Sequence, residues 1–198
     1  MIGQLLSALK AISDLPETEE RKLRSIVYEQ KLSKGEVFIH DGTVPQKFGF
    51  VVKGLFRYYY INGRGSEFTK GFFPENTFIT SYSAMTDGTP SYYTIEALED
   101  AVIFVFEYSK WKVLYNSHPC WREFLLALLE KGFRKKETRE RELLLLSAEE
   151  RYCSFRKEGP ALEKRIKQHL IASYLGITPV ALSRIRRNMG IKNRLDKR

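Results

Sequence analysis

The chain has 198 residues, 43% of them apolar, enough to form a packed core in one large or two small domains. Its two cysteines, Cys120 and Cys153, exclude a disulfide framework and show no CxxC spacing for zinc or an iron–sulfur cluster. No apolar run has the length of a membrane span and no secretory signal is visible, so we expect a cytoplasmic protein without a membrane partner.

The formal net charge of +9 is concentrated near one end of the chain. Residues 1–118 carry 13 Lys/Arg and 14 Asp/Glu, whereas residues 119–198 carry 20 and 10. Within residues 159–198 the counts are 10 and 2. A segment this basic with regular apolar spacing predicts a folded module that binds a polyanion, and a disordered basic tail is the alternative.

In the N-terminal part, apolar residues such as Leu5, Leu9 and Leu23 recur at helical spacing over residues 4–30 and predict two short helices separated near Pro16. From Lys34 the pattern changes to short β-rich runs between glycines, which favours a sandwich or barrel. The predicted strands cover residues 37–39, 48–52, 55–61, 67–73, 92–97 and 101–107.

A long helix is predicted from Pro119 to about Leu146, with a length of roughly 40 Å at ~1.5 Å per residue. Its apolar residues recur at i, i+3, i+4 and i+7, which predicts a stripe that needs a partner. We interpret the segment as a dimerisation helix paired with a second copy, and packing against its own barrel is the alternative. The expected dimer residues are Trp121, Phe124, Leu125, Leu128 and Gly132.

A new helix is predicted after Ser147, because Ser147 and Glu150 have the spacing of a capping box. Further on, residues 168–185 have the pattern of a helix-turn-helix. Gly176 suits the left-handed turn after the first helix, and Thr178 followed by Pro179 suits the start of the second.

The second of these helices has two different faces. Leu182, Ile185 and Met189 share an apolar stripe that we expect to face the core. The opposite stripe is typical of a recognition helix, because arginine can bond guanine edges and Val180 can contact a thymine methyl group. The expected base contacts are Val180, Ser183, Arg184 and Arg187, and the expected phosphate contacts are Lys167, Gln168, Thr178, Arg186, Lys192 and Arg194.

Over nearly its whole length the chain resembles the CRP/FNR family of catabolite-activator-like regulators. The resemblance rests on Lys34-Gly35-Glu36, Ile39-His40-Asp41-Gly42, Phe50-Val51-Val52-Lys53-Gly54 and the helix-turn-helix. It implies an α+β fold with a β-roll resembling a cyclic-nucleotide-binding domain, a dimerisation helix and a helix-turn-helix with a short or absent wing. The domains would cover residues 1–118, 119–146 and 147–198. It also implies a symmetric dimer on a pseudo-palindromic DNA site.

The chain departs from this family where its cyclic-nucleotide binders hold the ribose and phosphate. Ser81 replaces the glutamate, and Ser91-Tyr92 replaces the arginine pair, so no cation remains in that stretch to neutralise a phosphate. We therefore expect no cofactor and no cAMP binding. An unrelated ligand pocket would be lined by Ser81, Tyr82, Ser91, Tyr92 and Tyr93, although the three tyrosines are equally suited to the core.

The sequence thus predicts a homodimeric transcription regulator that binds double-stranded DNA, with RNA polymerase as a further partner. A small-molecule-binding module that regulates a protein partner without DNA binding is the alternative. A metal-dependent enzyme of the cupin type is not expected, because His40, His118 and His169 lie in three separate regions of the chain.

Overall fold

The computed structural model describes residues 1–191, which divide into two units. Unit 1 comprises residues 1–60 and 70–134, and unit 2 comprises residues 61–69 and the described residues from 135 onward. The division falls within helix α5 (Pro119–Leu145), so that its first turns belong to unit 1 and its last turns to unit 2.

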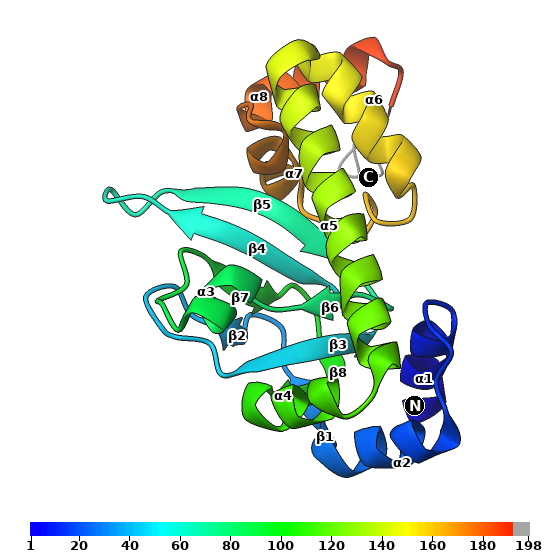
Figure 1. Cartoon of the computed structure of the whole chain (residues 1–198). Helices are drawn as coiled ribbons and strands as arrows, with labels where there is room; N and C mark the ends of the chain where they lie inside the picture. The colour runs from blue at the N-terminus through cyan, green and yellow to red at the C-terminus, as the bar shows by residue number, and fades with distance from the viewer. Residues whose placement is uncertain (192–198) are drawn as a thin grey trace. The chain divides into compact units, whose positions relative to one another are not determined.

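Unit 1 is built on two four-stranded sheets whose assigned strand pairs are antiparallel (Figure 1). The first sheet has the order β1 (Val27–Leu32), β8 (Ala101–Glu107), β3 (Lys47–Lys53) and β6 (Phe78–Ile79). The second has the order β2 (Val37–Ile39), β7 (Thr94–Ala97), β4 (Phe56–Ile61) and β5 (Glu67–Phe73), and the distal ends of β4 and β5 fall in unit 2. These strands form the predicted β-roll.

Strand β8 shows how the two faces of the first sheet are used. Ile103 and Val105 belong to an apolar cluster shared with the second sheet. Phe104 and Phe106 alternate with them and belong to a second cluster, with helices on the outer face. Because successive strand side chains point to opposite faces, a strand that is covered on both sides reads as a continuous apolar run.

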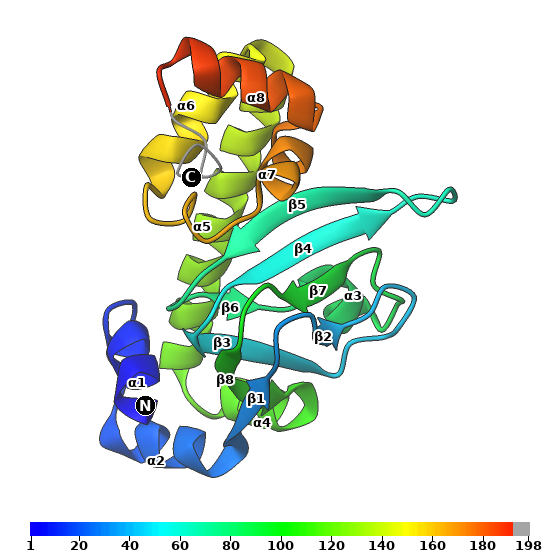
Figure 2. The same cartoon turned by 180° about the vertical axis from the view of Figure 1, so that it is seen from behind.

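Besides Met85 of a short helix, the outer cluster includes residues of three longer helices and of the first turns of α5. These helices are α1 (Ile2–Lys10), α2 (Glu17–Ile26) and α4 (Tyr108–Ser117), and Figure 2 shows α1 and α2 beside the start of α5. The two predicted N-terminal helices are confirmed, whereas β1, β6, α4 and the short helix α3 (Tyr82–Asp87) had no counterpart in the sequence prediction. Strand β1 was missed because it is an edge strand in which only Leu32 is buried, and its middle residues, Tyr28, Glu29, Gln30 and Lys31, are polar or exposed.

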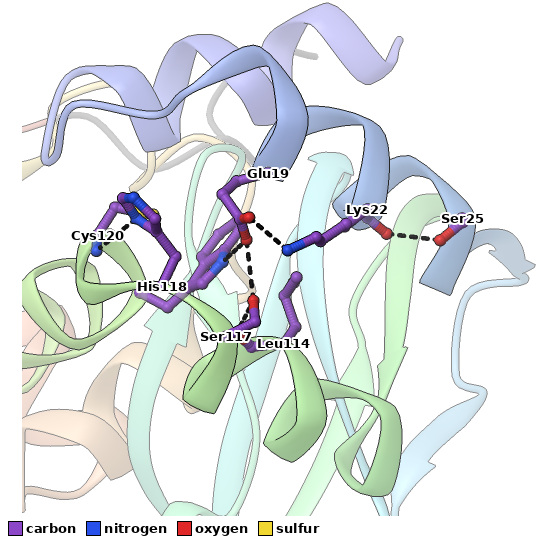
Figure 3. Close-up of polar contacts among 8 residues, drawn as sticks. Glu19, Lys22, Ser25, Leu114, Ser117, His118 and Cys120 are labelled. Carbon is purple, nitrogen blue, oxygen red and sulfur yellow. Dashed lines mark hydrogen bonds and ion pairs between the residues drawn. The ribbon is translucent and has the colours of Figure 1, made fainter.

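The start of α5 is fixed by a buried carboxylate on α2 (Figure 3). Glu19 is only 2% exposed and accepts hydrogen bonds from the indole N–H of Trp121 at 2.9 Å, from Ser117 Oγ at 3.0 Å and from Lys22 Nζ at 2.6 Å. Burial of the carboxyl opposes its ionisation, but these donors outweigh burial and lower the pKa of Glu19. One acid on α2 therefore holds the end of α4 and the first turn of α5.

Unit 2 contains the last turns of α5 with α6 (Ala148–Glu158), α7 (Gln168–Leu175) and α8 (Pro179–Asn188), which Figure 1 shows grouped together. The predicted capping box is confirmed, since Ser147 Oγ accepts from the Glu150 N–H and Glu150 accepts from the Ser147 N–H. The unit's apolar core consists of Tyr152, Phe155, Ile166, Leu170, Ile171, Ala172, Leu175 and Leu182. Among the described residues, no helix is both long and apolar enough to cross a membrane.

Candidate functional site

The turn between α7 and α8 has the geometry that the sequence predicted. Gly176 ends α7 in the left-handed region at φ 71°, where a residue with a Cβ would be strained. Thr178 is the N-cap of α8, and its hydroxyl accepts from the Ala181 N–H at 3.1 Å, with Pro179 in the first turn. Ala172 and Leu182, one from each helix, are fully buried. The two helices therefore form a helix-turn-helix.

The outward face of α8 brings together the four side chains expected to contact bases. Val180 is 70% exposed, although it is apolar, and Arg184 and Arg187 are also exposed. Ser183 lies between them and is half-buried. An exposed stripe with two arginines, a hydroxyl and an apolar side chain offers hydrogen-bond donors and a methyl contact to the edges of base pairs.

The structure contradicts the exposed position expected for Arg186. This residue is only 7% exposed, and its guanidinium is hydrogen-bonded to Glu163 and, at 2.7 Å, to Tyr152 Oη. The physical reason is helical spacing: Arg186 follows the buried Leu182 by four residues and shares its inward face. The sequence carried this signal, but the positive charge was interpreted as a phosphate contact.

The remaining phosphate candidates have different positions. Lys167 and Thr178 are exposed at the N-cap positions of α7 and α8, and Gln168 is half-buried. Thr178 already caps α8 through its side chain. Lys192 and Arg194, together with the expected short wing, lie outside the described residues.

Two arginines that sequence reasoning missed bind the C-terminal carbonyls of α7. Arg139 on α5 donates to the carbonyl of Tyr174 and stacks 3.9 Å from the centre of its ring. Arg151 on α6 donates to the carbonyls of Leu175, at 3.1 Å, and of Leu146, at 2.5 Å. Cations at a helix C-terminus are favoured by the partial negative charge there. These contacts fix α7 within unit 2.

The residues predicted to form the dimer stripe of α5 do not share one surface. Trp121 is fully buried and Phe124 is 2% exposed, both in the outer apolar cluster of unit 1, which Leu128 also contacts. Leu125 is half-buried, and Gly132 is exposed. Packing against the chain's own β-roll therefore accounts for Trp121 and Phe124.

A different set of apolar residues on α5 is exposed. Leu126 is 60%, Leu129 39% and Phe133 61% exposed. They are spaced at i, i+3 and i+7, so they lie on one side of the helix. We call these three residues the α5 stripe.

The five residues expected to line a ligand pocket are separated by the structure. Tyr92 is 83% exposed, and Tyr82 packs against the outer cluster of unit 1. Tyr93 instead belongs to the cluster between the two sheets, where Ser81 and Ser91 are also buried. Only Ser81, Ser91 and Tyr93 therefore remain together.

Tyr93 is held within a stack of aromatic rings in the β-roll. Its ring lies 5.2 Å from that of Tyr58, which in turn stacks 3.9 Å from Phe73. Tyr93 Oη donates to the Thr80 carbonyl at 3.2 Å, and Ser91 Oγ donates to the carbonyl of Tyr93 at 2.8 Å. Burial raises the pKa of Tyr93, so its hydroxyl remains a neutral donor. The polar groups at this position bond to one another.

Lys70 on β5 is a cation near this stack that sequence reasoning missed. Its ammonium lies 3.8 Å from the centre of the Tyr93 ring and 5.7 Å from that of Tyr60. Both distances are within the range of a cation–π interaction. No group of three or more His, Cys, Asp or Glu side chains that could hold a metal ion occurs within residues 1–191.

Comparison with known proteins finds one matching domain profile and several similar solved structures. Residues 29–118 match the profile of the cyclic nucleotide-binding domain. No curated protein matches the chain in sequence.

Among solved structures, FixK2 from Bradyrhizobium japonicum aligns with a TM-score of 0.73 at 19% identity, over 84% of this chain and 87% of that one. A putative transcriptional regulator of the CRP/FNR family from Eubacterium rectale gives 0.70 at 20% identity, over 90% and 85%. The Thermus thermophilus catabolite activator protein gives 0.56 at 20% identity, over 89% and 84%. The chain therefore matches the cyclic nucleotide-binding domain profile over residues 29–118 and has the fold of the CRP/FNR regulators.

Proposed function

We propose that this protein is a homodimeric transcription regulator that binds specific sequences of double-stranded DNA in the cytoplasm and has no catalytic activity. The observation that carries the proposal is the outward face of α8, where Val180, Ser183, Arg184 and Arg187 share one side of a helix-turn-helix. Placed in a major groove, the two arginines would donate to guanine O6 and N7. RNA polymerase would be a further partner.

The distribution of charge supports the same function. Residues 159–198, which contain the helix-turn-helix, hold 10 Lys/Arg but only 2 Asp/Glu. Lysine and arginine that neutralise phosphates release counterions from DNA, which supplies affinity for any sequence. The arginines on α8 would then supply the preference for one sequence.

The α5 stripe supports a dimer of two identical chains. Leu126, Leu129 and Phe133 expose apolar surface at the spacing of a coiled-coil seam. The neighbouring residues have both signs of charge, as in the ion pair of Glu130 with Arg134, so a second copy could be accommodated without net repulsion. Two copies related by a twofold axis would recognise half-sites about one helical turn, or roughly 34 Å, apart.

The interior of the β-roll supports regulation without cAMP. Ser81, Ser91 and Tyr93 are at most 9% exposed, and the side chains of Ser91 and Tyr93 are hydrogen-bonded within the protein. A cyclic nucleotide would have to displace the Tyr93 ring, and residues 78–93 supply no cation for its phosphate, while Lys70 of β5 is already in contact with that ring. We propose that DNA binding requires no cyclic nucleotide.

Selection of binding sites from a pool of random double-stranded DNA tests the proposed function. We expect the purified protein, without added ligand, to enrich an inverted repeat with half-sites about one turn apart. Enrichment of unrelated sequences would contradict sequence-specific binding. Enrichment of a single half-site without its repeat would contradict the dimer.

A further inference from the structure

A buried ion network on the inner face of α8 has no role in the function proposed above. Its centre is Glu163, whose side chain is 14% exposed, in the segment between α6 and α7. One of its oxygens accepts from Tyr152 Oη and from Arg186 of α8. The other accepts from Arg156 Nε of α6 at 3.0 Å. The carboxylate therefore joins α6 and α8.

The network has a complete set of donors and acceptors. Tyr152 is fully buried. Its burial and, to a smaller extent, its hydrogen bond to Glu163 raise the pKa of its hydroxyl, so the hydroxyl stays neutral and donates. The same hydroxyl accepts from Arg186 at 2.7 Å. A guanidinium that is 7% exposed requires a charged partner, because removing an ion from water without compensation is costly.

The position of Arg186 links this network to the outward face of α8. At about 100° of rotation per residue, Arg186 lies roughly 200° around the helix from Arg184, two residues earlier. A rotation or slide of α8 that moves the Arg186 head away from Glu163 must therefore move the Arg184 head as well. Apolar packing alone, through Leu182, resists such small motions less than a directional ion pair does.

From this geometry we infer that Glu163 is a positioning residue, which fixes the rotation and depth of α8 by binding Arg186 and thereby sets the preference for one DNA sequence. The inference rests on the proposed DNA-binding function. Glu163 need not touch DNA, because it acts through Arg186, Tyr152 and Arg156 on the opposite side of the helix.

The test compares specific with non-specific DNA binding in Glu163→Gln. This variant keeps the shape of the side chain but removes its charge, and affinities are measured for the selected site and for a scrambled duplex. We expect affinity for the selected site to fall by about tenfold or more, within the range of one lost base contact. Affinity for the scrambled duplex should remain close to wild type, because it depends on phosphate contacts.

A matched control and a second variant separate positioning from loss of folded protein. Glu149→Gln makes the same change of charge at an exposed position of α6, and it should leave both affinities unchanged. Arg186→Met removes the other partner. If the two residues act as a pair, the double variant Glu163→Gln/Arg186→Met loses no more preference for the selected site than the more affected single variant.

The outcomes are distinguishable. An equal loss of affinity for both duplexes in Glu163→Gln would overturn the inference, since it would indicate less folded protein. Unchanged affinity for the selected site, or additive losses in the double variant, would also overturn it. A wild-type protein that binds every sequence equally would refute the proposed function itself, and the inference with it.

Discussion

Replacing Glu19 by alanine would remove the acceptor that three groups share at the start of α5 (Figure 3). Lys22 and Ser117 are exposed and would bond to water instead, but Trp121 is fully buried and its indole N–H would lose its acceptor. A buried donor without a partner lowers the free energy of unfolding by about 1–3 kcal/mol, and hydrogen bonds to charged groups contribute more to stability than neutral ones do. We therefore expect Glu19→Ala to lower the free energy of unfolding by about 2–3 kcal/mol.

The assay is thermal unfolding followed by circular dichroism and by tryptophan fluorescence. For a chain of this size the loss corresponds to a midpoint lower by about 4–12 °C. Glu20→Ala is the matched control, because Glu20 is the next residue on α2 and its partners, Lys10 and Arg24, are about half exposed. Exposed ion pairs contribute little, so the midpoint of this variant should stay near that of wild type.

The pH dependence gives an independent check through Glu19→Gln. Because the pKa of Glu19 is lowered in the folded protein, its stabilising effect is fully present above the ordinary pKa of a glutamate. The effect is lost as the pH falls through the lowered folded value. Wild type should therefore be more stable than Glu19→Gln near neutral pH and should lose this advantage in acid. Equal midpoints for the Glu19 and Glu20 alanine variants, or a difference between wild type and Glu19→Gln that does not depend on pH, would contradict the stabilising role of the Glu19 carboxylate.

Three further predictions concern the proposed function. Phe133→Glu should dissociate the dimer, as measured by light scattering, because it removes about 2 kcal/mol of apolar burial per copy and adds like charges. Val113→Glu, at an exposed apolar residue of α4, should remain dimeric. A dimeric Phe133→Glu protein would contradict the α5 stripe as the interface. cAMP should leave the unfolding midpoint unchanged, and a rise that grows with its concentration would contradict the closed core around Tyr93. If 6–10 phosphates are contacted, DNA affinity should fall by about 10³–10⁵ between 50 and 200 mM salt, and a flat response would contradict that number of contacts.

Local chemistry explains why the helix-turn-helix could be predicted from the sequence. A glycine at the left-handed turn, a threonine cap and a proline in the first turn each have one strong structural preference, and the structure has all three where expected. The strands at residues 37–39, 67–73 and 101–107 were predicted with their observed bounds for a similar reason. Each is short, rich in β-branched or aromatic residues and bounded by turn residues or a charge.

The remaining features depend on contacts between residues distant in the chain. Helical spacing identified the apolar residues Trp121 and Phe124, but spacing does not say whether a helix stripe packs on the same chain or on a second copy. Helical spacing already put Arg186 on the inward face of α8 with Leu182, but the partner of its charge, Glu163, lies 23 residues earlier and could not be identified from the sequence. The α5 stripe was not recognised from the sequence either, because its residues stand out as exposed only once the buried side of α5 is known.

DNA recognition by the outward face of α8 can be measured directly as the affinity of Arg184→Ala for the selected DNA site, compared at one salt concentration with that of Arg21→Ala. Arg21 is exposed on α2 of unit 1, so its replacement removes the same charge away from α8. We expect Arg184→Ala to stay dimeric and to lose about 10- to 100-fold in affinity for the selected site, with its binding to scrambled DNA much less affected. Arg21→Ala should bind both duplexes nearly as wild type does. An Arg184→Ala protein that binds the selected site as tightly as Arg21→Ala does would contradict the claim that the outward face of α8 recognises DNA.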